Sequence, residues 1–331
     1  RKESSAASDV YKRQHQGRAR LDEIKIIVTP EDSVRIGALL SNQAGFIRQI
    51  QAYDEQRVTD RKFPVYAAST RGVNDSLAFR PDNERVADVR VRKALLHATN
   101  AKEIVQTLFT ANYPQAKGVI VSTAAGFVDL SAELAFDEAK AKALLDEAGW
   151  VPQADGIRAK DGLPLVLSTY ESLNYLQNRE VLQLVAQQWA KVGVKLNVLS
   201  GDLGSKTIDS LDPEKTALIP AMVGRADPDV IKSNYYPTNR NLLLQKGGIS
   251  QKVKSFEDTR LNGLFDAIAQ EPDTARRLAL TQDVQRYLIE QAYVIPLFEE
   301  PQVFAGAPWL RDVDFEAVGR PSFYRTWIAP R

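Results

Sequence analysis

The sequence predicts an α/β fold in which helices cover a sheet. Strand-like and helix-like segments alternate through the middle of the chain, an order typical of such layered folds. The helix-like segments repeat apolar residues every three to four positions, while the strand-like segments are short and rich in β-branched residues. With 331 residues, the chain is long enough for two ordinary domains.

The first residues differ from the rest of the chain. Residues 1–14 (RKESSAASDVYKRQ) are polar and have no apolar period. A secretory signal would show an apolar core and a small-residue cleavage site, and neither is present there. We therefore expect residues 1–20 to be disordered or foreign to the folded protein. Strands are expected at Leu21–Thr29, Phe63–Ala68 and Ser76–Phe79, and a short helix at Asp32–Leu40.

The clearest helix is Val89–Ala98. Its residues Val91, Ala94, Leu95 and Ala98 fall on one stripe. Further helices are expected from the cap Asn100 through Leu108, over Phe136–Trp150 with Asp137 as N-cap and Gly149 at its end, and over Asn174–Lys191, Phe256–Ala269 and Thr274–Gln291.

A hairpin turn is expected at Asp161-Gly162, between strands Ile157–Lys160 and Leu163–Thr169. Later strands are expected at Val194–Leu199, Thr216–Val223 and Tyr293–Phe298. The segment Gly224–Gly248 is predicted to be a long loop, and such loops usually carry function or are disordered. The aromatic residues of Pro301–Arg331 indicate a packed C-terminal segment.

Composition excludes several classes of protein. The net charge is +1, so no strong field favours nucleic acid, and no apolar stretch approaches the roughly 20 residues of a membrane helix. Without cysteine there are no disulfides, thiolate metal sites or cysteine nucleophiles. The two histidines, His15 and His97, are far apart, and His97 is expected to pack within its helix. No cofactor, metal site or phosphate-binding loop is predicted.

Five segments together resemble one family, the solute-binding proteins of family 5 of ABC importers, which includes oligopeptide-, dipeptide- and nickel-binding proteins. The first three are DVRVRKALLHATNA (Asp88–Ala101), FDEAKAKALLDEAGW (Phe136–Trp150) and QLVAQQWAKVGVKLNV (Gln183–Val198). The other two are the loop Met222–Asp229, which ends in Asp-Pro-Asp, and Asp273–Phe298. All five occur in the family's order, between Leu21 and Arg331.

The resemblance implies a two-lobed periplasmic-binding-protein fold of the type II-like class. Family members are typically longer at the N-terminus, so lobe I is expected to be incomplete. Residues 21–80 and 301–331 would form part of lobe I, and residues 81–300 would form lobe II. The chain would cross between the lobes near Ser76–Arg85 and Val294–Val303, as hinge strands.

The resemblance also implies a function. The protein would capture a peptide-like solute outside the cytoplasm, in the periplasm or anchored at the cell surface, and deliver it to the permease subunits of an ABC importer. It would act as a monomer and not as an enzyme, and a chemoreceptor is a further partner compatible with this role. Binding of an anionic solute, such as an opine-like conjugate or a metal chelate, is the alternative. A carboxylate-dependent hydrolase is disfavoured, because no Gly-x-Ser-x-Gly motif or usable histidine constellation is present.

The loop after Thr216–Val223 is the first candidate for ligand contact. Peptide-binding members carry there an aspartate that meets the ligand's amino group, and this chain has Gly224 followed by Arg225. Met222 stands in the region where many members have an aromatic residue. Arg225 either binds an anionic ligand group, with the Gly224 backbone close by, or pairs with Asp227 or Asp229 and shapes the loop. Asp227 and Asp229 themselves are expected to form a turn.

Other candidates lie on neighbouring segments. Asn239 and Asn241 stand where family members often meet the ligand's backbone groups, and Tyr235 and Tyr236 either line the cleft or pack on the surface. Glu299 and Glu300 follow an apolar strand and point to opposite faces, so they form no acid/base dyad by themselves. One of them could bind a cationic group, with a hinge or solvent role as the alternative. Tyr170 and Glu171, at the end of Leu163–Thr169, have the same two alternatives.

Overall fold

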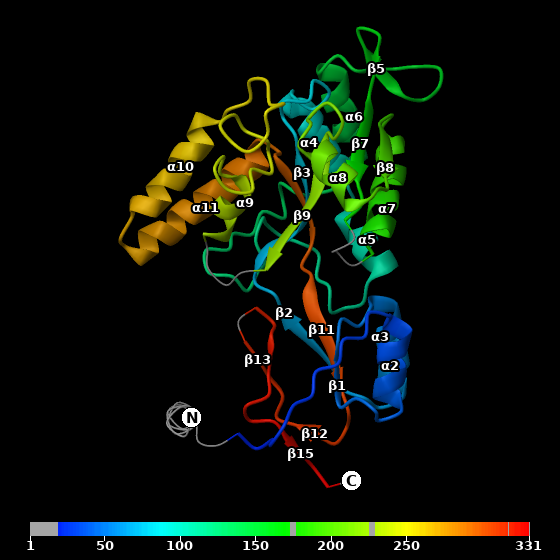
Figure 1. The fold of residues 1–331 in the computed structure, drawn as a ribbon. Helices are drawn as coiled ribbons and strands as arrows, with labels where there is room; N and C mark the ends of the chain where they lie inside the picture. Colours follow the sequence, from blue (N-terminus) through cyan, green and yellow to red (C-terminus); the bar gives the residue numbers. More distant parts are fainter. Residues whose placement is uncertain (1–18, 173–176, 225–228, 317, 331) are drawn as a thin grey trace. The chain divides into compact units, whose positions relative to one another are not determined.

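A computed structural model describes residues 19–172, 177–224, 229–316 and 318–330 (Figure 1). The first residues of the chain, and with them the predicted disorder of residues 1–14, lie outside this range. The chain divides into two compact units. Unit 1 consists of the residues up to Ala68 together with those from Gln302 onward, and unit 2 is Ser69–Pro301. Residues 69–80, which the family resemblance implies are part of lobe I, lie in unit 2.

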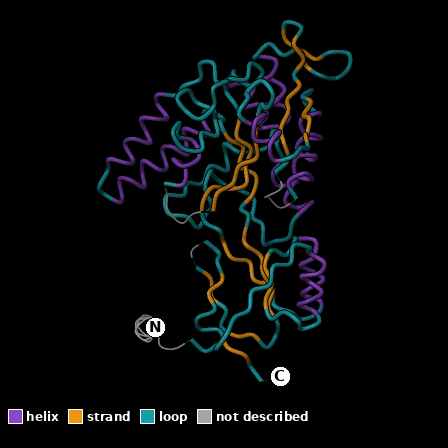
Figure 2. The backbone as a smooth tube through the Cα atoms, viewed as in Figure 1, coloured by secondary structure: helices purple, strands orange, loops and turns teal. Residues whose placement is uncertain are grey.

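The centre of unit 2 is an antiparallel sheet of three strands in the order β10-β3-β9. They span Val294–Phe298 (β10), Gly72–Phe79 (β3) and Leu218–Gly224 (β9). All residues of β3 are buried, as expected for a strand with a neighbour on each side. Figure 2 shows these strands running together through unit 2. The sequence predicted all three of these strands, and β3 is longer than the expected Ser76–Phe79.

A second, parallel pair of strands completes the α/β pattern. Strand β7 (Val166–Tyr170) pairs in parallel with β8 (Lys195–Leu199), and helix α7 (Asn178–Ala190) lies between them in sequence. Parallel strands need such a crossover connection. The small sheet β4 (Val151–Pro152), β5 (Arg158–Lys160) and β6 (Leu163–Pro164) precedes them. Its turn residues Asp161 and Gly162 both have positive φ, at 50° and 80°, as a two-residue hairpin turn of type I′ requires, and the predicted hairpin turn is present.

Of the remaining helices of unit 2, two begin directly after the predicted caps Asn100 and Asp137. The helices at Leu203–Ser210 and Val230–Tyr235 were not predicted, and the second lies in the segment expected to be a long loop. The remaining helices are α4 (Val89–Ala98), α5 (Ala101–Leu108), α6 (Glu138–Glu147), α8 (Leu203–Ser210), α9 (Val230–Tyr235), α10 (Thr259–Gln270) and α11 (Thr274–Glu290). The side chains of Asp88, Asn100 and Asp137 each accept a hydrogen bond from a backbone N–H in the first turn of the helix that follows. Such caps satisfy donors that the helix itself leaves free. No helix in the described part of the chain is long and apolar enough to cross a membrane.

Unit 1 is a smaller sheet with two helices and an aromatic core. Its strands are ordered β1-β11-β2, with β1 at Phe46–Arg48, β2 at Val65–Ser69 and β11 at Pro301–Gly306. The helices are α2 (Asp32–Leu40) and α3 (Ala52–Asp60). Two short pairs, β12 (Leu310–Arg311) with β15 (Trp327–Ile328) and β13 (Asp314–Phe315) with β14 (Pro321–Ser322), finish the chain. Phe304 packs on Phe46 and Phe315, so the aromatic C-terminal segment is packed, as predicted.

The strand predicted at Leu21–Thr29 is wrong. These residues form no strand, and Ile26 and Val28 are both 87% exposed. A β-branched run becomes a strand only when a neighbouring strand accepts its hydrogen bonds. No described strand pairs with this segment.

Trp189 in α7 tests the packing of unit 2. Its side chain is fully buried, stacks with Phe79 and donates a hydrogen bond from Nε1 to Thr99 Oγ1 at 2.9 Å. We expect Trp189→Ala to lower the free energy of unfolding by about 3–5 kcal/mol, because it leaves a large cavity. Urea unfolding followed by circular dichroism measures this. Ile249→Ala, at a side chain that is 64% exposed, is the control and should change stability by less than about 0.5 kcal/mol.

Candidate functional site

One end of the β10-β3-β9 sheet gathers several of the predicted site residues. Because β3 runs antiparallel to both neighbours, the ends of β9 and β10 flank its start. Gly224 pairs with Gly72, and Phe298 pairs with Asp75. Met222, Gly224 and Glu299 are therefore brought to the same end of the sheet. The predicted roles of Arg225 and Asp227 lie outside the described residues.

Glu299 fixes a neighbouring segment of unit 2. Its side chain is 8% exposed, and Oε1 accepts a hydrogen bond from the Ser122 backbone N–H at 2.8 Å. The Glu299 backbone N–H donates to the Pro114 carbonyl at the same distance. A carboxylate that accepts a backbone N–H inside the protein forms a strong, charge-assisted bond. This geometry supports the structural alternative for Glu299, and the predicted contact with a cationic ligand group stays a prediction.

Two further carboxyls lie at this end of the sheet, Asp75 on β3 and Glu300 two residues after the end of β10. Both side chains are buried, with exposures of 1% and 6%. The oxygens Asp75 Oδ1 and Glu300 Oε2 have no hydrogen-bond partner. Burial, and then the charge of Glu300, hold the pKa of Asp75 well above its usual range, and burial raises the pKa of Glu300 to about 7. The backbone carbonyl of Glu300 accepts a hydrogen bond from Thr70 Oγ1 at 2.8 Å.

Sequence reasoning missed Asp75. The polar run Asn74-Asp75-Ser76 looks like a turn signal and not like part of a buried strand. The signal that could have found it is position, since it directly precedes the apolar run Leu77–Phe79. Glu300 was named, but its partner across the sheet was not.

Tyr170 and Glu171 belong to a separate polar cluster. Tyr170 is the last residue of β7 and Glu171 follows it, beside the end of β8, where ligands often bind in α/β sheets. The Tyr170 hydroxyl donates to Asp209 Oδ2 at 2.8 Å, and this bond raises the pKa of the hydroxyl. Glu171 pairs with Arg179 at 2.7 Å. Both side chains already have partners in the protein, and their predicted ligand contacts remain untested.

The two candidate asparagines differ in environment. Asn241 is fully buried, with φ at 50°, and its amide bonds both the N–H (2.7 Å) and the carbonyl (2.8 Å) of Gln245. Asn239 is exposed, and its Nδ2 donates to the Lys232 carbonyl at 3.2 Å. The geometry therefore gives Asn241 a role in the shape of the loop. The ligand contact predicted for each stays a prediction.

The other predicted residues near this loop are also placed. Tyr235 is buried, while the Tyr236 hydroxyl donates to Asp266 Oδ1 at 2.8 Å. Asp229 is the N-cap residue of α9, but its side chain makes no capping hydrogen bond. His97 packs within α4 as expected: it is buried, and its Nδ1 lies 2.9 Å from the Ala135 carbonyl.

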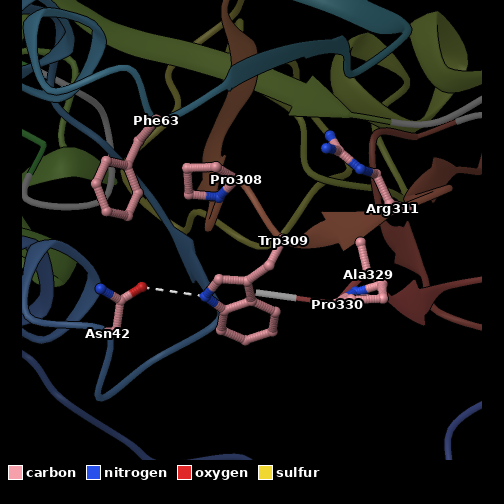
Figure 3. Close-up of a pocket in the computed structure, with 7 residues that line it drawn as sticks. All are labelled: Asn42, Phe63, Pro308, Trp309, Arg311, Ala329 and Pro330. Atoms are coloured by element: carbon pink, nitrogen blue, oxygen red, sulfur yellow. Dashed lines mark hydrogen bonds between the residues drawn. The ribbon is translucent and has the colours of Figure 1, made fainter.

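Two hollows lie away from these residues. The first, of about 480 Å³, is in unit 1, where Trp309 Nε1 donates to Asn42 Oδ1 at 3.0 Å (Figure 3). It is lined by Asn42, Phe63, Pro308, Trp309, Arg311, Ala329 and Pro330. The second, of about 340 Å³, lies beside Trp150 and Lys160 in unit 2. Neither contains a predicted site residue. Among the described residues, no group of three or more acidic or histidine side chains is placed to hold a metal ion.

Comparison with known proteins identifies the family. The model of the bacterial extracellular solute-binding proteins, family 5, matches residues 5–241, more than half of the chain. The chain belongs to this family. The resemblance expected from the five sequence segments is thereby confirmed.

Individual members of family 5 are distant in sequence. The dipeptide-binding protein of Escherichia coli is 24% identical over 277 residues, covering 82% of this chain and 49% of that protein. Heme-binding protein A of Haemophilus influenzae is 26% identical over 299 residues, covering 89% of this chain and 49% of the relative. The chain thus spans about half the length of the curated relatives it matches.

Solved structures of family 5 proteins confirm the fold class. NikA from Brucella suis, solved in complex with Fe(III)-EDTA, superposes with a TM-score of 0.80 at 21% identity, over 95% of this chain and 63% of NikA. A Pseudoalteromonas dipeptide-binding protein in complex with Met-Leu superposes with a TM-score of 0.72 at 17% identity, over 91% of this chain and 57% of that protein. The predicted α/β periplasmic-binding-protein fold is confirmed by these likenesses.

The two asparagines allow a matched test of structural and binding roles. We expect Asn241→Ala to lower the free energy of unfolding by about 2 kcal/mol, because it removes two buried hydrogen bonds to Gln245. Asn239→Ala, at an exposed position in the same loop, should cost less than about 0.5 kcal/mol. Chemical unfolding of both variants measures the difference. Equal stabilities would show that the Asn241 amide does not hold the loop.

Proposed function

We propose that the protein is the extracytoplasmic solute-binding component of an ABC importer. It captures a peptide-like or related small solute and delivers it to the permease subunits in the membrane. The observation that carries this proposal is the match of residues 5–241 to family 5. Relatives whose names refer to dipeptides, glutathione and heme support a small-solute cargo. The proposed location is the periplasm or the outer surface of the cell membrane.

The architecture supports a binder that works by closure. Two compact units are joined by two chain connections, one after Ala68 and one after Pro301. Bending at a few residues between compact units is a common way to close around a ligand. A solute stabilises the closed form only by its higher affinity for that form. The closed form would be the one that docks on the permease, with the protein acting as a monomer.

The chemistry of the cargo rests on the loop after β9. With Gly224 in place of the family's amine-binding aspartate, the sequence of the loop lacks that carboxyl group, and the guanidinium of Arg225 suits a carboxylate or phosphate. An acidic peptide, an opine-like conjugate or an anionic metal chelate fits this chemistry better than a peptide held by its amino terminus. The solved complex of NikA with Fe(III)-EDTA is an example of an anionic chelate on the same fold.

Solute binding is tested by thermal shift. We expect at least one member of a panel of di- and tripeptides, acidic peptides, glutathione, heme and Fe(III)-EDTA to raise the Tm. A ligand at 100 times its Kd stabilises the native state by about 2.7 kcal/mol. Calorimetry of each hit should give a saturable Kd without turnover of the ligand. A flat thermal-shift profile over the whole panel, or turnover of a hit, would count against the proposal.

Arg225 is tested by the affinity for the hit from that panel. We expect Arg225→Ala to weaken binding about tenfold or more, the scale of one charged hydrogen bond at roughly 1.5–3 kcal/mol. Arg240→Ala is the control, because Arg240 is an exposed arginine further along the same segment. Titration calorimetry of both variants at one salt concentration measures the two affinities. An unchanged affinity for Arg225→Ala removes this residue from the site and favours its pairing with Asp227 or Asp229.

A further inference from the structure

The buried pair Asp75 and Glu300 lies on the two strands that connect the units. Unit 2 begins at Ser69 and ends at Pro301, so Asp75 follows the first connection closely and Glu300 directly precedes the second. The strands are hydrogen-bonded to each other, with Phe298 opposite Asp75. An interaction between these two side chains therefore links the two chain connections within unit 2.

The backbone around Asp75 is irregular on both sides. The pairing of β3 with β9 shifts register between Val73 and Ser76, and the pairing with β10 shifts between Pro296 and Phe298. Bulges of this kind redirect a side chain and often lie beside functional groups. A regular ladder at this point would place Asp75 differently with respect to Glu300. The position of Asp75 relative to Glu300 therefore depends on these two register shifts.

Few charged groups accompany the pair. Strand β9 has no titratable residue, and β10 is followed by Glu299, whose carboxylate binds Ser122 N–H. Arg71 on the first connection and Lys117 on the neighbouring segment are exposed. The helices that pack on β3 and β10 contribute Lys232 and Tyr235 from α9, Lys102 and Glu103 from α5, and Tyr287 and Glu290 from the last turn of α11.

None of these groups compensates the pair. Of the described residues, only Glu300 alters the pKa of Asp75 through its charge, and it raises that pKa. No described residue places a cation beside the two carboxyls, and two buried carboxylates without one cannot both stay ionised at low cost. Such a pair retains a proton at a pH where exposed carboxyls have lost theirs.

We propose that Asp75 and Glu300 form a proton-dependent clasp between the two connecting strands, closed when the pair holds a proton and loosened when both carboxyls are ionised. The clasp is a property of unit 2 and does not depend on the solute-binding proposal. The stability of the strand ends therefore depends on pH. The conformational freedom of the two chain connections depends on pH for the same reason.

The direction of the pH dependence follows from the raised pKa values. Glu300 ionises near its ordinary value of 4.5 in the unfolded chain and near 7 in the folded protein, and the pKa of Asp75 is raised as well. Between these values the folded state binds more protons, so the free energy of unfolding falls as pH rises. The stabilising contribution is complete below about pH 4.5 and is lost by the time pH has passed 7. For Glu300 alone, the unfolding equilibrium constant should rise roughly 30-fold between pH 5.5 and pH 8.

Three variants test the clasp by chemical unfolding between pH 5.5 and pH 8. Glu300→Gln should make the rise of the unfolding equilibrium constant between pH 5.5 and pH 8 at least about tenfold smaller. The double variant Asp75→Asn with Glu300→Gln should remove the rest. Glu299→Gln is the matched control, a neighbouring carboxyl with its own backbone donor, and should keep the wild-type pH dependence. The proposal is overturned if Glu300→Gln behaves like the wild type, or if Glu299→Gln loses the pH dependence equally.

Two measurements on the wild-type protein keep the test decisive if the variants fold poorly. Infrared difference spectra should show a protonated carboxyl band near pH 6 that disappears by pH 8. Amide hydrogen exchange, corrected for intrinsic rates, should become faster at pH 8 in residues 69–75 and 298–303 than in the reference strands β7 and β8. Absence of the protonated band, or uniform exchange in all four segments, contradicts the clasp.

Discussion

Strand β3 is the element on which the rest of unit 2 depends. It is hydrogen-bonded along both edges, to β10 and β9, and none of its residues reaches solvent. A buried strand must satisfy every polar group that it carries. The Asn74 amide donates to the carbonyls of Gly118 and Ile120, and Ser76 Oγ donates to the Ala221 carbonyl. These bonds attach β9 and the loop at residues 118–120 to the same strand.

Two side-chain oxygens of this strand are exceptions, because Asn74 Oδ1 and Asp75 Oδ1 are buried without a hydrogen-bond partner among the described residues. Asp75 also lies close to the point where both chain connections leave the unit. A sequence optimised for stability alone would place a neutral side chain opposite Phe298, since an unpaired buried carboxyl costs several kcal/mol or must keep its proton. Departures of this kind from local rules concentrate at functional or strained positions. The same end of the sheet carries Gly224, whose backbone pairs with Gly72. The fold thus brings a titratable pair and the proposed ligand loop to opposite edges of a single strand.

The sequence predicted what is local and missed what depends on partners far along the chain. The longer helices, the caps Asn100 and Asp137, and the turn at Asp161-Gly162 were predicted, because each is encoded within a few consecutive residues. The short helices α3, α8 and α9 were not predicted. The strand expected at Leu21–Thr29 failed because strand formation requires a neighbour that the local pattern does not contain. The pairing of Asp75 with Glu300 was invisible for the same reason. It depends on the register of β3 against β10 and on a bulge in that register, and neither has a sequence signal of its own.

For the candidate site, too, the sequence identified some residues and could not identify others. Met222, Gly224 and Glu299 could be grouped because a family resemblance ordered them along the chain, and the sheet then placed them at one end. Tyr170 and Asn241 could not be separated from structural residues by type, because tyrosine and asparagine serve both purposes. Only the geometry shows that Asp209 accepts from Tyr170 and that Gln245 occupies the amide of Asn241. A solute that brings positive charge to the strand ends would favour the ionised pair, and by linkage the ionised pair would favour that solute. Such a cationic solute would act on the two connections in the direction opposite to the proton, whereas the anionic solute proposed for Arg225 would act in the same direction as the proton.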